Sequence, residues 1–230
     1  MNSKPLLIVL GEPYSVFPEI LFKCFKKLSL NKLKRPIVLI GSSKLIFKQL
    51  KYFNYNFKIN NISEDKIHLI KNNNSINIIN VNLSFKKNFD KSPKNRSEYI
   101  KNSFKKALMI LKKRQAIGLI NGPVSKSLFL KKKFLGITEY LGHFTKTKNV
   151  VMLIYNKNLS VSPITTHLPL KEVVKKINKN LILQNVKILN KFYKKIIKKK
   201  PKIAILGLNP HCETVDKISE EKKIILPAIK

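Results

Sequence analysis

The chain has 230 residues and a formal net charge of +35, from 47 Lys and Arg against 12 Asp and Glu, and 43% of its residues are hydrophobic. This length and apolar content allow a buried core in one large or two small domains, which excludes wholesale disorder. The apolar run at residues 150–155 is far shorter than the about 18 residues that a membrane span needs, so no membrane partner is expected.

Short apolar, β-branched runs alternate with segments of helical period along the chain. The runs predict strands at residues 6–10, 37–40, 76–81, 116–120, 150–155 and 203–206. Apolar stripes predict helices over residues 20–28 behind Pro18 and Glu19, over 100–111 with Ser97 as N-cap, and over about 180–199. Strand then helix, repeated, predicts an α/β fold, a mostly parallel sheet with helices on both faces.

The segments between these elements predict loops and domain limits. The polar stretches 54–66 and 86–96 are predicted to be long loops, and 72–74 is predicted to be a turn. We expect one continuous region, 1–230, with two lobes over 1–125 and 126–230 and a cleft between them.

Charge and cysteine content bear on partners and location. Lysines occur in almost every block of ten residues, with dense runs only at 131–133 and 194–202. Nucleic-acid binding needs cations concentrated on one face, so this scatter argues against a nucleic-acid partner. Cys24 and Cys212 make no disulfide framework, which favours a reducing, cytoplasmic location.

Two histidines follow predicted apolar strands or segments, at the positions where a parallel sheet binds ligands. His167 lies in the segment 165–170 and His211 in 207–211, each with a proline within two residues. Neutral imidazole suits Zn, Co or Ni, so the pair could bind one divalent metal. Two hydrogen-bonded loop histidines are the alternative interpretation, because a catalytic zinc site typically has three protein ligands.

Lys126 follows the predicted strand 116–120, where a loop turns into a helix N-terminus. Such a position favours anions, and Lys126 could neutralise a phosphate there. One more surface lysine among many is the competing interpretation.

Several short segments, read together, match one enzyme family in order and spacing. They are Gly11-Glu12-Pro13, Pro18-Glu19, and the segments 121–126, 136–140, 165–170 and 207–211. Together they resemble the 4-hydroxythreonine-4-phosphate dehydrogenase family of pyridoxal phosphate biosynthesis. The segments around His167 and His211 are the most specific, whereas any of the shorter motifs alone would be a weak signal.

The resemblance implies a reaction and a set of ligands. The reaction is the NAD-dependent oxidation and decarboxylation of 4-phosphooxy-L-threonine, a small phosphorylated amino acid, to 3-amino-2-oxopropyl phosphate. The resemblance also implies a fold like the isocitrate and isopropylmalate dehydrogenases, a homodimer, and a divalent metal (Zn, Mg or Co) bound by His167 and His211. Thr138 matches a substrate contact, and the metal would stabilise the alkoxide as hydride leaves.

The sequence departs from the family pattern in three places. Ile137 stands where the family usually has a histidine, and residues 14–17 replace glycines of the first loop. The chain also stops at Lys230, about a third short of the family's usual length. The resemblance therefore predicts a C-terminally truncated member of the family, which lacks the third metal histidine and most of the NAD site. The 230-residue chain could be inactive for this reason.

Two other functions stay open from the sequence. One is a basic α/β protein that binds RNA or another polyanion and has lost catalysis. The other is a dehydrogenase of a related sugar-acid phosphate, which would use the same metal ligands.

Overall fold

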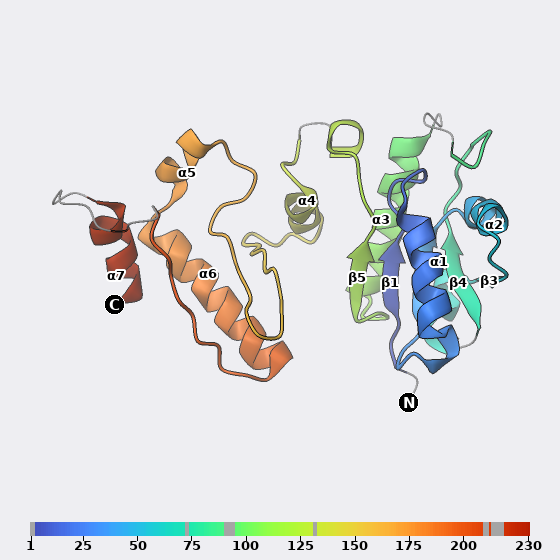
Figure 1. Ribbon diagram of the computed structural model, residues 1–230, viewed down its shortest axis with the longest axis horizontal. Helices are drawn as coiled ribbons and strands as arrows, with labels where there is room; N and C mark the ends of the chain where they lie inside the picture. Colours follow the sequence, from blue (N-terminus) through green and yellow to red (C-terminus); the bar gives the residue numbers. More distant parts are fainter. Residues whose placement is uncertain (1–2, 72–73, 90–94, 131–132, 209–211, 213–218) are drawn as a thin grey trace. The chain divides into compact units, whose positions relative to one another are not determined.

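The computed structural model divides into two units, Met1–Lys133 and Phe134–Lys230 (Figure 1). The first unit contains a five-stranded parallel sheet. The structure describes residues 3–71, 74–89, 95–130, 133–208, 212 and 219–230.

The strands of the first unit pair in parallel throughout. They are β1 (Leu6–Val9), β2 (Ile37–Gly41), β3 (Lys58–Asn61), β4 (Ser75–Asn80) and β5 (Gly118–Asn121), in the spatial order β3-β4-β2-β1-β5. Leu7 lies opposite Val38 on one side and Leu119 on the other. The predicted α/β fold with a parallel sheet is confirmed.

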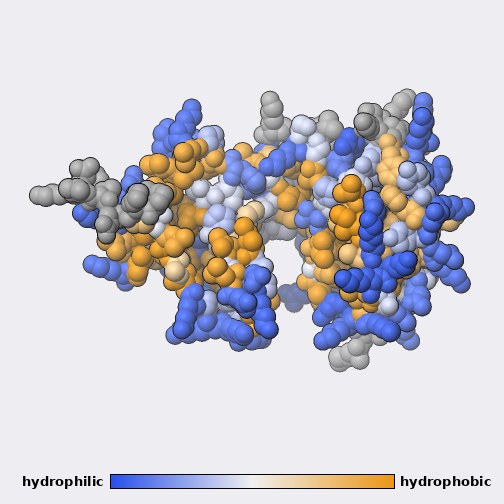
Figure 2. All heavy atoms as spheres, in the orientation of Figure 1, coloured by the Kyte–Doolittle hydropathy of each residue, from blue (hydrophilic) through white to orange (hydrophobic). Residues whose placement is uncertain are grey.

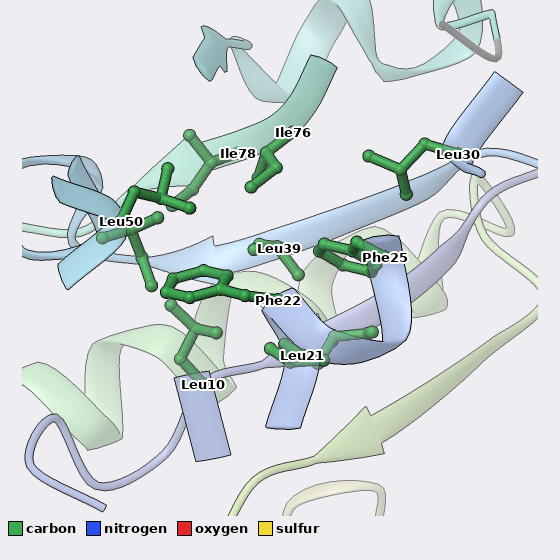
Figure 3. Packing of buried hydrophobic residues seen from close by; sticks show 11 residues of the cluster. Leu10, Leu21, Phe22, Phe25, Leu30, Leu39, Leu50, Ile76 and Ile78 are labelled. Carbon is green, nitrogen blue, oxygen red and sulfur yellow. The ribbon is translucent and has the colours of Figure 1, made fainter. Parts of the chain in front are cut away.

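Helices α1 (Phe17–Leu28) and α2 (Ser43–Tyr52) pack on one face of this sheet. Phe22 of α1 is fully buried and packs with Leu39 and Ile78, which lie in neighbouring strands (Figure 3). Because side chains alternate along a strand, Leu7 and Val38 point to the opposite face. There α3 (Arg96–Lys112) contacts β1 and β2.

Two details of the first unit differ from the sequence-based expectation. The polar stretch predicted as a loop over 54–66 contains β3, an edge strand on which Ile59 is half-buried and its neighbours are exposed. An edge strand needs little apolar surface, so its sequence lacks the usual signal. The N-cap of α3 is Asn95, so Ser97 lies inside the first turn.

Short 3₁₀ turns span Leu30–Lys32 and Glu64–Leu69, and a π-helical turn spans Lys126–Leu130.

The second unit contains four helices among its described residues. They are α4 (Ile137–Phe144), α5 (Leu170–Lys176), α6 (Lys179–Phe192) and α7 (Leu226–Ile229), with π-helical turns over Tyr193–Ile197 and Glu221–Ile225. Helix α6 and the following turn confirm the predicted helix at 180–199. A small core joins Ile182 of α6 to Ile225 and Ala228.

The strands predicted at 150–155 and 203–206 are wrong. Ile154 makes only an isolated antiparallel bridge with Val161, and no strand spans 203–206 in the part of the chain that the structure describes. Ile154 and Leu206 are both exposed. An apolar, β-branched composition favours a strand only where a neighbouring strand accepts its backbone hydrogen bonds. Within the described ranges, no helix combines the length and apolarity required to cross a membrane.

Candidate functional site

The loops that follow β1 and β5 pack tightly against each other. Gly11 has a φ of 67°, in the left-handed region, and a Cβ built on it would lie 2.3 Å from the Pro123 carbonyl oxygen. Glu12 N–H donates to the same oxygen at 2.8 Å. A Cβ on Gly122 would lie 2.3 Å from the Leu10 oxygen. Both glycines are therefore required by close backbone approach at this exit of the sheet.

Glu12 connects three segments at this exit. Its buried carboxylate accepts a hydrogen bond from Arg96 Nε through Oε2 and from Ser125 N through Oε1, the latter at 3.0 Å. Lys126, exposed, is the next residue and begins the π-helical turn. Glu12 and Arg96 thus hold the segment that carries Lys126. Sequence reasoning named Glu12 within a motif but missed Arg96, because the partners are 84 residues apart.

A cavity of about 300 Å³ lies within the second unit. Its wall includes Thr138 and Glu139 from the first turn of α4, Thr166 from the loop before α5, and Asn185 of α6. Thr138, predicted as a substrate contact, therefore lies at a hollow large enough for part of a small ligand. Tyr140, on the same helix, packs against Phe134 and Phe144, and burial raises the pKa of its hydroxyl.

Glu139 and Thr166 form a hydrogen bond at this cavity. Thr166 Oγ1 donates to Glu139 Oε1 at 3.1 Å. Glu139 Oε2 is buried and accepts no hydrogen bond from the described residues. A buried carboxylate oxygen without a donor is costly, so this atom marks a place that suits a cation or a donor from a ligand.

His167 and that oxygen both lie close to Gly136. A Cβ built on Gly136 would lie 3.0 Å from His167 Nε2 and 2.9 Å from Glu139 Oε2, so both atoms approach the same point. His167 has a φ of 57°, in the left-handed region, and its side chain is exposed.

An imidazole nitrogen and a carboxylate oxygen are donors that divalent transition metals accept. These donor types fit the divalent metal that the resemblance implies, and His167 is the predicted ligand that lies within the described residues. No cluster of three His, Cys, Asp or Glu side chains occurs within the described ranges. His211, the other predicted ligand, lies outside the described residues.

The predicted site residues fall into separate groups. Thr138 and His167 both lie near Gly136 in the second unit. Lys126 belongs to the first unit. Ile137, at the position where the family usually has a histidine, is the first residue of α4.

The loop after β1 does not fit the pyrophosphate of NAD. Its one glycine faces the backbone of Pro123, and the buried carboxylate of Glu12 lies at the same exit. A dinucleotide loop instead needs open backbone N–H groups and no competing negative charge.

A second cavity, of about 640 Å³, lies in the first unit and was not predicted. Several asparagines line it, but they are engaged with nearby groups. Asn80 Oδ1 accepts hydrogen bonds from Ser43, and Asn95 Oδ1 accepts one from Ser84 N. These side chains support the loops around β4 and α3.

Known proteins resemble this chain along nearly its full extent. A family model for the pyridoxal phosphate biosynthetic protein PdxA matches residues 32–230. A 4-hydroxythreonine-4-phosphate dehydrogenase from Sulfurihydrogenibium sp. (strain YO3AOP1) is 35% identical over 235 residues, which cover 98% of this chain and 69% of that protein. A Clostridium botulinum relative with the provisional name D-threonate 4-phosphate dehydrogenase is 28% identical over 243 residues. The match covers 100% of this chain and 70% of the length of that relative.

A solved structure shares the fold. The 4-hydroxythreonine-4-phosphate dehydrogenase from Klebsiella pneumoniae superposes with a TM-score of 0.80 at 23% identity, over 99% of this chain and 71% of that one. The fold and these similarities define a protein of the α/β dehydrogenase class. The chain belongs to the pyridoxal phosphate biosynthetic protein PdxA family, as the resemblance predicted.

Proposed function

We propose that this protein is an NAD-dependent 4-hydroxythreonine-4-phosphate dehydrogenase. It oxidises and decarboxylates 4-phosphooxy-L-threonine to 3-amino-2-oxopropyl phosphate in pyridoxal phosphate biosynthesis. The observation that carries the proposal is family membership over residues 32–230, together with His167 close to Gly136 and Thr138 two residues after that glycine in the second unit.

The residues of the chain have distinct parts in this proposal. The Thr138 hydroxyl, at the wall of the cavity in the second unit, binds a polar group of the substrate. In the first unit, the exposed Lys126 ammonium neutralises a phosphate group. His167 and His211 hold a divalent metal. When bound, this metal supplies a Lewis acid for the hydroxyl oxygen that is oxidised. Imidazole ligands favour Zn or Co over Mg.

Three further features belong to the proposal. NAD accepts the hydride, but the loop after β1 does not supply its site. The protein acts as a homodimer. It acts in the cytoplasm, which is consistent with Cys24 and Cys212 not being joined by a disulfide.

The test is NADH formation from 4-phosphooxy-L-threonine with added Zn²⁺, Co²⁺ or Mg²⁺. Metal-dependent NADH formation by the 230-residue chain supports the proposal. Its absence with every metal contradicts this activity for the chain and leaves the family membership unchanged. The Clostridium relative makes D-threonate 4-phosphate a second candidate substrate. A higher kcat/KM for that compound would reassign the substrate and leave the reaction class unchanged.

Polyanion binding remains the competing prediction. On the face shown in Figure 2, hydrophilic residues are spread over both units rather than gathered in one patch. RNA retention on a filter at two salt concentrations tests it, because binding through phosphates weakens steeply with salt.

A further inference from the structure

Glu139 joins the loop that carries His167 to helix α4. It lies in the first turn of α4, next to Thr138, and its Oε1 accepts the hydrogen bond from Thr166 Oγ1 at 3.1 Å. The partners are 27 residues apart in sequence. The bond therefore fixes the residue before His167 against the helix that carries the proposed substrate contact.

The backbone of His167 needs such support. A φ of 57° is unfavourable for a residue with a side chain and costs about 1 kcal/mol or more. A residue keeps this conformation only where the surrounding contacts hold it. The Thr166 hydrogen bond to Glu139 acts on the adjacent residue, so it restrains the direction in which the imidazole leaves the backbone.

The second carboxylate oxygen of Glu139 points to an electrostatic role as well. Glu139 Oε2 is buried, accepts no hydrogen bond from the described residues, and approaches the same point as His167 Nε2. A carboxylate kept only for the Thr166 contact would need one acceptor oxygen, which an amide could also provide. The charged oxygen is instead suited to a cation bound by the imidazole.

We propose that Glu139 is a positioning residue for the metal-binding imidazole of His167. Through Oε1 it holds the Thr166 side chain, next to His167 in the chain, and through Oε2 it places a carboxylate oxygen near Gly136, which the imidazole also approaches. The ligand is a divalent transition cation, and the inference rests on the metal site of the proposed function. Partners that orient a metal-binding histidine typically contribute about 10–100-fold to metal affinity.

The experiment is a titration of the full chain with Co²⁺ alone, followed by the visible absorption of the bound ion and by calorimetry. Thr166→Val removes the hydrogen bond, and Thr166→Ser keeps the hydroxyl. Glu139→Gln keeps an acceptor for Thr166 but removes the charge. Glu172→Gln is the matched control, because Glu172 lies in the first turn of α5 and forms an ion pair with the exposed Lys175 of the same helix.

We expect Thr166→Val and Glu139→Gln to weaken Co²⁺ affinity by about 10–100-fold and to alter the absorption spectrum. Thr166→Ser and Glu172→Gln should match the unmodified chain. Thermal unfolding of each variant measures stability separately. A purely structural role would lower the melting temperature while leaving the affinity and the spectrum unchanged, and that result overturns the inference.

His167→Ala separates this inference from the proposed function. If His167→Ala abolishes Co²⁺ binding while Thr166→Val and Glu139→Gln bind normally, the positioning role is wrong and the metal site stands. If His167→Ala binds Co²⁺ as well as the unmodified chain, the metal site is wrong and the positioning role falls with it.

Discussion

Glu12, at the exit of β1, forms an ion pair with Arg96, the first residue of α3. The Glu12 side chain is 9% exposed and that of Arg96 is 23% exposed. This pair, with the hydrogen bond from Ser125 N, joins the exits of β1 and β5 to a helix on one face of the sheet. It is the contact that places the segment carrying Lys126.

Glu12→Ala should destabilise the first unit. The substitution leaves a largely buried guanidinium without this carboxylate and removes the acceptor of Ser125 N, so we expect a loss of about 2–4 kcal/mol in the free energy of unfolding. Urea unfolding measures it. Glu19→Ala is the control, since its pair with Lys23 is exposed and should contribute little to stability. Equal losses in the two variants would show that the Glu12 contact has no special role.

Gly122→Ala should also be destabilising, by at least about 2 kcal/mol. Its new Cβ would meet the Leu10 backbone oxygen at 2.3 Å and Phe17 Cδ1 at 2.7 Å, and the backbone oxygen cannot move without disturbing β1. Gly118→Ala is the matched control on β5, because its Cβ would meet nothing closer than Leu6 Cδ1 at 3.7 Å. A melting curve of each variant tests the difference, and a Gly122→Ala protein as stable as Gly118→Ala would refute the close approach.

Tyr99→Phe should change both stability and its dependence on alkaline pH. The Tyr99 hydroxyl is buried and accepts a hydrogen bond from Ser42 N at 3.1 Å. Its loss leaves that N–H without this acceptor, which costs about 1–3 kcal/mol.

The sign of the pH effect follows from burial, which raises the pKa of Tyr99 above its ordinary value of 10.0. The unfolded chain releases this proton near pH 10 and the folded chain does not. The stability from this group is therefore complete below pH 10 and declines as the pH rises further. The stability difference between the unmodified chain and Tyr99→Phe should shrink from pH ~8 to ~11.

The buried part of the fold could be predicted from sequence. Strands such as β1 and β2 are covered on both faces, so they appear as continuous apolar runs. The edge strand β3 carries polar residues and gave no such run. The run at 150–155 has strand-like composition without a strand partner among the described residues, and local composition cannot reveal whether a partner is present.

The candidate site was predictable only in its motif residues. Thr138 and His167 lie in segments whose order matches a known family. Glu139 lies in one of these segments, yet its bond to Thr166 depends on how the chain folds back over 27 residues. The same holds for Glu12 and Arg96, whose partnership is a long-range contact that neither local spacing nor charge indicates.

The most direct test of the proposed function compares NADH formation by His167→Ala and His68→Ala with that of the unmodified chain. His68 is exposed on the 3₁₀ turn of the first unit, so its removal controls for the general loss of an imidazole. With 4-phosphooxy-L-threonine and Co²⁺, we expect His68→Ala to keep the full rate and His167→Ala to fall to background. An unchanged rate in His167→Ala would contradict the proposed function.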